Sequence, residues 1–231
     1  MAVSPPSGKI ALMNREPFAT GEYYHIYNRG VDKRVTFVNH YDIDRFFQSL
    51  KIFNSVKPIG SLYEKSFELN KKSGAKSNKP LVNIICYCLN PNHYHLILEQ
   101  LVERGISEFM KRVNGGYTWY FNNRHKRSGT LFQGVFKSKL IKNNDYLLHL
   151  SAYVNLNNRV HQLGGETAKL SKSSFNEYMK KIKGESICKT DVILNQFKGP
   201  KDYKKFCHEA LDAMVEKKIE DKELELLLLE N

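Results

Sequence analysis

Length, composition and charge already exclude several classes of protein. The chain has 231 residues, of which 41% are hydrophobic, with 36 lysines and arginines against 24 aspartates and glutamates. This content excludes a disordered or collagen-like chain and suffices for one domain with an appendage. Four cysteines do not indicate a disulfide framework. Neither a membrane span nor a signal peptide is visible, so we expect a cytoplasmic protein with no membrane partner. The net charge of +12 favours a polyanionic partner such as nucleic acid.

Apolar residues recur along the chain with the periods of strands and helices. Strands are predicted at residues 23–28, 81–89, 93–100 and 130–141. Helices are predicted at residues 42–56, at 106–122 and from a cap at 143–145 to about 158. The second helix contains Gly115 and Gly116, where we expect it to be broken or strained. Pro91 and Asn92 form a turn signal between the second and third strands, so these strands are expected to pair as a hairpin.

The order strand–helix–strand–strand–helix–strand is that of a split βαβ fold. We therefore predict an α+β protein with a ferredoxin-like or RRM-like antiparallel sheet, helices on one face, and a C-terminal helical extension. The expected divisions are a flexible N-terminal arm at 1–20, the folded domain at 21–160, a basic extension at 161–207 and an acidic amphipathic helical tail at 208–231. Residues 57–80, rich in Lys, Ser, Gly and Asn, are expected to form a surface loop.

Two histidines stand two residues apart on the third predicted strand. Residues i and i+2 of a strand point to the same face, so His93 and His95 present their imidazoles side by side. That spacing suits a shared metal ion, although two surface histidines on a half-buried strand would give the same pattern. Cys86 and Cys88 precede the turn, and a structural zinc site with the two histidines is an alternative that their tight spacing disfavours.

The last predicted helix carries a second candidate pair. Tyr153 and Asn157 are four residues apart, so they stack on one helix face and place a phenol beside an amide oxygen. A buried tyrosine and a helix-end asparagine would also explain them. Tyr153 and Asn157 become candidates for a functional site if this helix packs near the strand that carries His93 and His95.

Basic residues are concentrated in one part of the chain. Between residues 104 and 142 there are nine lysines and arginines and a single acid, Glu108. Such a stretch fits a groove that binds a phosphate backbone, although a solvated basic face is an equal alternative for any one residue. The candidates for DNA binding are Arg29, Lys111, Arg112, Arg124, Lys126, Arg127, Lys137, Lys139 and Arg159.

Four segments in this order resemble the HUH-type single-tyrosine transposases of the insertion-sequence-200/605 kind, most of all the group associated with repetitive extragenic palindromes. They are Tyr24-His25-Ile26-Tyr27-Asn28-Arg29-Gly30, residues 87–98 (YCLNPNHYHLIL), residues 131–138 (LFQGVFKS) and Tyr153-Val154-Asn155-Leu156-Asn157. Each motif alone is too short to identify a family, but the occurrence of all four in the family's order is specific to it. Where the family usually has methionine before the turn, this chain has Asn90.

The resemblance implies roles for the candidate residues. His93 and His95 match the metal ligands of the HUH motif, Asn157 matches the polar side chain that completes the metal site, and Tyr153 matches the catalytic nucleophile. It also implies Mg²⁺ or Mn²⁺ as cofactor, single-stranded and hairpin-forming DNA as partner, a monomer or homodimer, and association with the nucleoid. The expected activity is that of a single-stranded DNA endonuclease and strand transferase acting through a 5′-phosphotyrosine.

Two other functions remain open from the sequence. One is a non-cleaving, domesticated nucleic-acid-binding module of the same fold, which would need none of His93, His95 and Tyr153. The other is a relaxase or replication-initiator nickase, a class that often carries a second tyrosine one turn from the first.

Overall fold

The computed structural model describes residues 17–57, 79–182 and 186–229. The arm predicted at 1–20 and the loop predicted at 57–80 lie almost entirely outside these ranges. A 3₁₀ turn at Val31–Lys33 follows the first strand. None of the helices in the described ranges is both long and apolar enough to cross a membrane.

A five-stranded sheet forms the centre of the molecule, with strand order β4-β1-β3-β2-β5. Its strands are β1 (Tyr23–Arg29), β2 (Val82–Asn90), β3 (His93–Gln100), β4 (Lys137–Leu140) and β5 (Lys172–Ser173). Every neighbouring pair of these strands is antiparallel. The first four strands have the ferredoxin-like order that the sequence predicts, and the α+β fold class is therefore confirmed. The hairpin of β2 and β3 is also confirmed.

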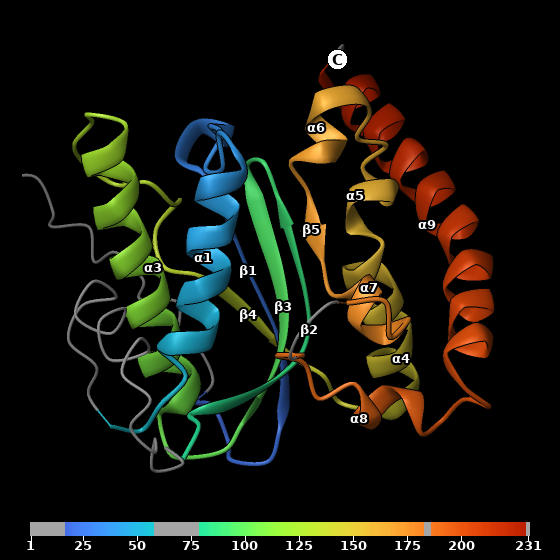
Figure 1. Ribbon diagram of the computed structural model, residues 1–231. Helices are drawn as coiled ribbons and strands as arrows, with labels where there is room; N and C mark the ends of the chain where they lie inside the picture. The colour runs from blue at the N-terminus through green and yellow to red at the C-terminus, as the bar shows by residue number, and fades with distance from the viewer. Residues whose placement is uncertain (1–16, 58–78, 183–185, 230–231) are drawn as a thin grey trace, which may run out of the picture.

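Helices α1 (His40–Ile52) and α3 (Gly105–Arg124) cover one face of the sheet (Figure 1). The side chain of Asn39 begins α1 by accepting a hydrogen bond from the backbone of Asp42. Apolar side chains of the two helices meet the β3 residues that point to this face, Tyr94, Leu96 and Leu98, in one buried cluster. This layer leaves the opposite face of β3, where His93 and His95 lie, for other elements.

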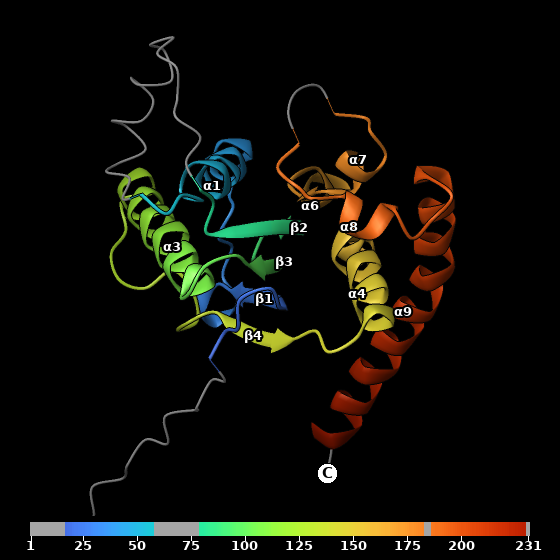
Figure 2. The same ribbon diagram turned by 90° about the horizontal axis from the view of Figure 1, so that it is seen from below.

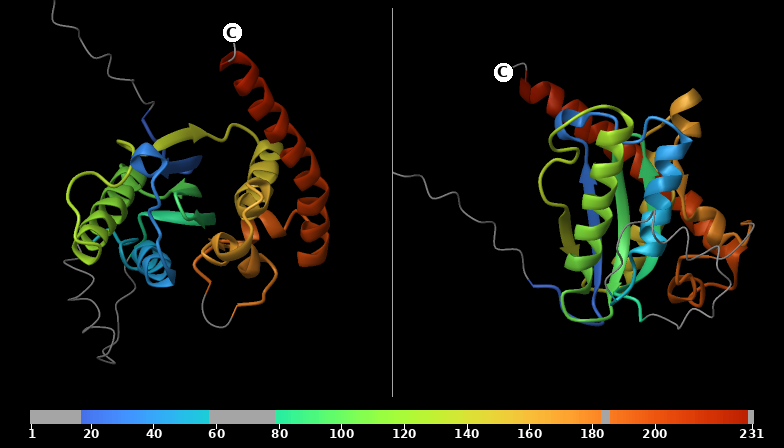
Figure 3. Two further views of the ribbon diagram at one scale, coloured as in Figure 1. Left: turned by 90° about the horizontal axis from the view of Figure 1, so that it is seen from above. Right: turned by 60° about the vertical axis from the view of Figure 1, so that its left-hand side comes forward.

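The second face is covered by α4 (Asn144–Asn155), the chain after it and the long helix α9 (Pro200–Leu229), as Figures 2 and 3 show. The short helices between them are α5 (Asn157–Val160), α6 (Gly165–Lys169), α7 (Phe175–Tyr178) and α8 (Asp191–Leu194). Tyr178, Ile193 and Tyr203 of this segment are fully buried with Ile85 and Ile97 of the sheet. The C-terminal extension is thus part of the hydrophobic core, and α9 runs without a break through the boundary expected at residue 208.

Three local predictions differ from the structure. The strand expected at 130–141 is reduced to β4, because Gly134 turns the chain with φ +66° and Phe132 and Phe136 pack into the core. Helix α3 continues through Gly115 and Gly116. A Cβ at Gly116 would lie 2.9 Å from the ring of Phe53, so this glycine permits close helix packing and causes no break.

The helix expected to reach about residue 158 ends earlier. Asn143 caps α4 as predicted, by accepting a hydrogen bond from the backbone of Tyr146. The helix then ends at Asn155, and Leu156, with φ −108°, separates it from α5. The Asn155 side chain accepts from Ser174 and donates to Tyr203, so it ties the end of α4 to the extension.

A buried carboxylate holds part of the extension against the sheet. Glu177 accepts hydrogen bonds from the Tyr87 hydroxyl, the Ser186 hydroxyl and the backbone of Ile187 and Cys188. Glu177→Ala leaves these donors without an acceptor, and we expect it to lower the free energy of unfolding by about 3 kcal/mol. Chemical denaturation of the variant measures this, with the exposed Glu209→Ala as control. An equal stability of both variants would contradict the assigned role.

Candidate active site

The two histidines of β3 lie on the sheet face that α4 covers. Arg29 of β1 is opposite His93, and Tyr27 is opposite His95, so all four side chains share this face. The rings of His93 and His95 are 5.2 Å apart between centroids and nearly perpendicular. His95 is buried and His93 partly exposed, so a ligand would reach the pair from the side of His93.

A third histidine, His25 of β1, orients His95. Its Nε2 lies 2.9 Å from Nδ1 of His95, and the two rings stack at 5.1 Å. Because Nδ1 of His95 makes this hydrogen bond, Nε2 is the nitrogen that remains for a ligand. Burial lowers the pKa of His25 to about 4, with a further contribution from Lys139, and burial also holds the pKa of His95 well below its usual value. Both rings are therefore neutral at pH 7, as an imidazole that binds a metal must be.

Asparagines fix the orientation of His93. Its Nδ1 lies 2.6 Å from Oδ1 of Asn92, which can only accept, so His93 donates from Nδ1 and Nε2 carries a lone pair. Nε2 lies 3.0 Å from Oδ1 of Asn157, and Nδ2 of Asn90 donates to both of these acceptors. Burial lowers the pKa of His93. Two acceptors thus converge on one donor, while Nδ2 of Asn157 has no partner among the described residues.

Tyr153 of α4 reaches the same place. Its ring stands edge-on to that of His95, with 5.6 Å between centroids. Burial raises the pKa of the Tyr153 hydroxyl, and the neighbouring Asn157 side chain opposes part of this rise. The structure therefore brings together the four residues singled out in the sequence, from β3, α4 and α5, within one chain.

The donor set suits a divalent cation. His93 Nε2 and Asn157 Oδ1 both accept from the neutral amide of Asn90, so two possible ligand atoms point to one place. Mixed nitrogen and oxygen ligands suit Mn²⁺ and tolerate Mg²⁺. Among the described residues, no group of three or more His, Cys, Asp or Glu side chains is placed to hold a metal ion. A set of two histidines and an asparagine amide is not such a group, because only two of its members are of these types. The alternative zinc site with Cys86 and Cys88 gains no support from this geometry.

The nine basic candidates divide between two sides of the molecule. Lys137 is opposite Tyr27 and Lys139 opposite His25, so these two lysines share the face of the histidines with Arg29. Arg159 follows Asn157 on α5. The other candidates, which belong to α3 and the turn after it on the opposite face of the sheet, are Lys111, Arg112, Arg124, Lys126 and Arg127.

All three arginines on the α3 side have structural partners. Arg124 lies 3.8 Å from the buried carboxylate of Asp42. Arg112 is paired with Glu108 at 2.8 Å and donates to the carbonyl of Ser55. Arg127 donates to Asn122 and to the carbonyl of Thr130, which closes the turn after α3. A phosphate contact by any of these arginines would have to replace its present interactions.

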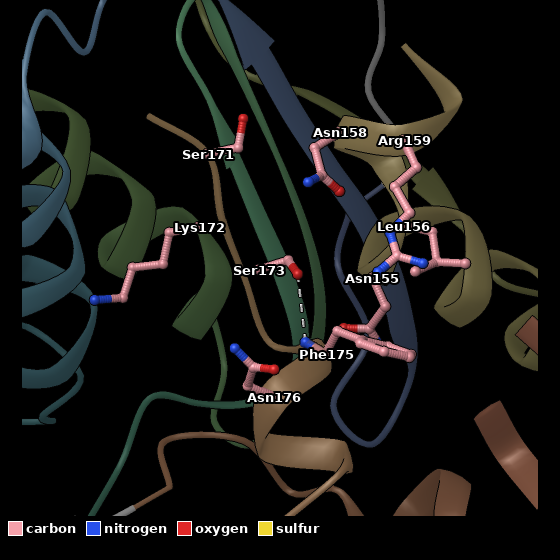
Figure 4. A pocket seen from close by; sticks show the side chains of 9 residues that line it. All are labelled: Asn155, Leu156, Asn158, Arg159, Ser171, Lys172, Ser173, Phe175 and Asn176. Atoms are coloured by element: carbon pink, nitrogen blue, oxygen red, sulfur yellow. Dashed lines mark hydrogen bonds between the residues drawn. The ribbon is translucent and has the colours of Figure 1, made fainter. Parts of the chain in front are cut away.

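A small polar cavity lies beside α5 (Figure 4). Its volume is about 240 Å³, and it is lined by Asn155, Leu156, Asn158, Arg159, Ser171, Lys172, Ser173, Phe175 and Asn176. The Arg159 guanidinium lies 5.8 Å from the ring of Phe175. Lys172 points toward α1, where its ammonium is 3.2 Å from Asp44. Arg159 is thus the charged group that this cavity offers to a ligand.

Sequence reasoning missed several residues of the site. His161 lies with its ring 4.7 Å from that of His93, and Lys218 of α9 contacts His161. His161 could have been found, because it follows Asn157 by four residues. His25 lies in a segment that carried the family resemblance. No local signal marks Lys218, which is 57 residues from its partner.

The buried His25 predicts a stability that depends on pH. Its pKa of about 4 is lower than that of an unfolded histidine, so the unfolded chain binds more protons between pH 6.5 and 4. Stability from this group is therefore present at neutral pH and is lost as the pH falls through this range. We expect His25→Gln to reduce the loss between pH 7 and pH 5 by about 2 kcal/mol. Urea unfolding at both pH values measures it, and an unchanged pH dependence would contradict the assignment.

The fold and site together define a ferredoxin-like domain with a histidine pair and a tyrosine on one face. A family model described as "Transposase IS200 like" matches residues 62–157, a span that ends at Asn157 and includes His93, His95 and Tyr153. Over this span the match supports the family resemblance of the sequence motifs. No curated protein matches the chain. A solved structure of a REP-associated tyrosine transposase bound to a REP hairpin is 13% identical, with a TM-score of 0.44, and the match covers 74% of this chain and 90% of that one.

Proposed function

We propose that this protein is a metal-dependent transposase and endonuclease that cleaves and rejoins single-stranded DNA through Tyr153, at hairpin or palindromic sequences. The observation that carries the proposal is the position of the Tyr153 ring, 5.6 Å from that of His95 and beside Asn157 and His93. A nucleic-acid-binding module has no need for a tyrosine placed against two oriented, neutral imidazoles. The hairpin preference is supported by the sequence motifs alone.

The metal site of this proposal consists of His93 Nε2, His95 Nε2 and Asn157 Oδ1. Asn92 sets the tautomer of His93, because its Oδ1 accepts from Nδ1. Nε2 of His95 has a free lone pair when Nδ1 of His95 donates to Nε2 of His25. A bound Mg²⁺ or Mn²⁺ would withdraw charge from the scissile phosphate. Asn90 donates to two of the three ligand atoms, so its side chain has to move when a cation binds.

Tyr153 is the nucleophile in this mechanism. Its Oη attacks the scissile phosphorus, the bond from phosphorus to the 3′ oxygen breaks, and the phenol loses its proton as the departing 3′ oxygen gains one. The products are a 5′-phosphotyrosine and a free 3′ hydroxyl. A 3′ hydroxyl can attack the phosphotyrosine in the reverse sense and join two strands, so no nucleotide cofactor is consumed. The raised pKa of Tyr153 means that the phenol is protonated at pH 7 and has to be activated in the bound complex.

The DNA backbone would follow the basic residues on the histidine face. Arg29, Lys137 and Lys139 lie along β1 and β4 on this face, and Arg159 lies at the other side of the site on α5. Each would neutralise a phosphate without reading a base. The five basic residues at α3 would serve a different part of the substrate, such as a hairpin stem.

All elements of the proposed site come from one chain. Tyr153 stands beside His95 of the same molecule, so the reaction can be completed in cis and a monomer is sufficient. A homodimer that exchanges α4 is the alternative. Mixing a Tyr153→Phe chain with a His95→Ala chain distinguishes them, because activity would return only if the helix serves a partner.

A covalent-adduct assay tests the function. Single-stranded oligonucleotides from the flanks of the gene, with and without hairpins, are incubated with the protein and Mg²⁺ or Mn²⁺. We expect a protein–DNA adduct on a denaturing gel that forms with metal and not with EDTA. Binding without an adduct, under both metals and across the hairpins, would favour the non-cleaving module. An adduct with oligonucleotides that lack hairpins would favour a nickase.

A further inference from the structure

The C-terminal helix α9 brings a lysine to the site. α9 packs along α4 and α5, with Phe206 against His149 and Tyr203 bonded to Asn155. More than three helical turns beyond Phe206, the ammonium of Lys218 reaches Nδ1 of His161. The His161 ring in turn lies against that of His93. Lys218 thus contacts a residue that itself contacts the proposed metal ligand His93, although the sequence predicts its segment to be an acidic tail.

Lys218 differs from the other lysines of α9 whose side chains the structure describes. The neighbouring Lys217 is exposed, and Lys205 forms a surface pair with Glu209, whereas Lys218 is partly buried. Among the described side chains, no carboxylate forms an ion pair with Lys218. An ammonium can only donate, so Nδ1 of His161 accepts a hydrogen bond from Lys218. The positive charge itself is not compensated by any described group.

The position of this charge points to an anionic ligand. Lys218 contacts His161, and the His161 ring centroid lies 4.7 Å from that of His93. A partly buried cation that forms no ion pair with a described carboxylate is costly unless an anion occupies the site in the working state. DNA brings a phosphate to this place when its scissile bond lies between Tyr153 and the histidines.

We propose that Lys218 is a phosphate-binding residue of the DNA site, and that α9 therefore forms part of the substrate-binding surface. The inference rests on the proposed function and deepens it. The ammonium keeps its hydrogen bond to His161. It donates a second hydrogen bond to a non-bridging oxygen of the scissile phosphate or of the adjacent phosphate in the strand. Unlike the family motifs, which end at Asn157, this contact comes from the extension.

The test is a binding measurement that does not depend on cleavage. Fluorescein-labelled hairpin and unstructured single-stranded DNA are titrated with the full chain in EDTA at several salt concentrations. We expect Lys218→Met to weaken binding by about tenfold at low salt and to reduce the salt slope by about 0.7, the value for one phosphate contact on a single strand. Lys218→Arg should retain most of the affinity, and Lys217→Met, one residue away and exposed, should equal the wild type.

A second variant keeps the test valid if Lys218→Met is unstable. Lys218→Gln preserves a donor to His161 and removes the charge, and it should show the same loss of affinity and slope. Affinity and slope equal to those of Lys217→Met, or tighter binding, would overturn the proposal. This outcome is separable from failure of the proposed function, because the wild-type adduct would still form. If Lys218→Met binds DNA more weakly but the wild type forms no covalent adduct, the phosphate contact of Lys218 is supported and the proposed cleavage reaction is rejected.

Discussion

Replacing Tyr153 with phenylalanine is expected to abolish the covalent protein–DNA adduct while leaving DNA binding nearly unchanged. The substitution removes only the hydroxyl, and the ring can keep its edge-on contact with His95. Without a nucleophile, strand cleavage should fall by about 10³-fold or more, as it does when a nucleophile is removed from other enzymes that act through a covalent intermediate. Gel analysis of the adduct and fluorescence anisotropy of binding, on the same preparation, measure both effects.

The necessary control is a second tyrosine beside the same histidine. Tyr27 of β1 stacks on His25 at 4.8 Å and on His95 at 5.8 Å, so its ring is about as close to His95 as that of Tyr153. Tyr27→Phe should leave the adduct in place. An adduct that persists in Tyr153→Phe and is lost in Tyr27→Phe would identify Tyr27 as the nucleophile and overturn the assignment.

Much of the sheet could be predicted from local sequence. β3 begins and ends where alternation places it, at His93 and Gln100, because a Pro-Asn turn before it sets the register of the hairpin. That register fixes which residues share a face, so the proximity of His93 and His95 follows from two-residue spacing alone. The sequence could not predict that Tyr153 lies beside the histidines, since this depends on how α4 packs on the sheet.

The remaining features depend on contacts between distant residues. Gln133 accepts from Arg29 and Phe132 enters the core, and these contacts override the strand propensity of residues 130–136. His25 and His95 are 70 residues apart, and their hydrogen bond exists because β1 pairs with β3. Lys218 reaches the site through the packing of α9, which is set by buried Tyr203 and Cys207 far from it in the chain. No local periodicity contains this information.

Replacing His93 with alanine should also abolish adduct formation while DNA binding is retained. Unlike Tyr153→Phe, this variant should lose metal affinity. His93→Ala deletes a nitrogen whose lone pair is fixed by Asn92 and which lies 3.0 Å from the Asn157 oxygen. We expect Mn²⁺ affinity to fall by about 100-fold and adduct formation to fall with it, while binding in EDTA is retained. Titration of Mn²⁺ followed by electron paramagnetic resonance measures the affinity directly.

The control for this variant is a histidine on the same face of α4 as the nucleophile. His149 is exposed and lies against Phe206, four residues before Tyr153, so His149→Ala should leave the Mn²⁺ affinity unchanged. A metal that binds the native fold also stabilises it, by about 2.7 kcal/mol at 100 times its dissociation constant. This stabilisation should be present in the wild type and His149→Ala and absent in His93→Ala. If His93→Ala kept both the Mn²⁺ affinity and the stabilisation, the metal would lie elsewhere, and the hydrogen-bonded network of Asn90, His93 and Asn157 would be a structural one.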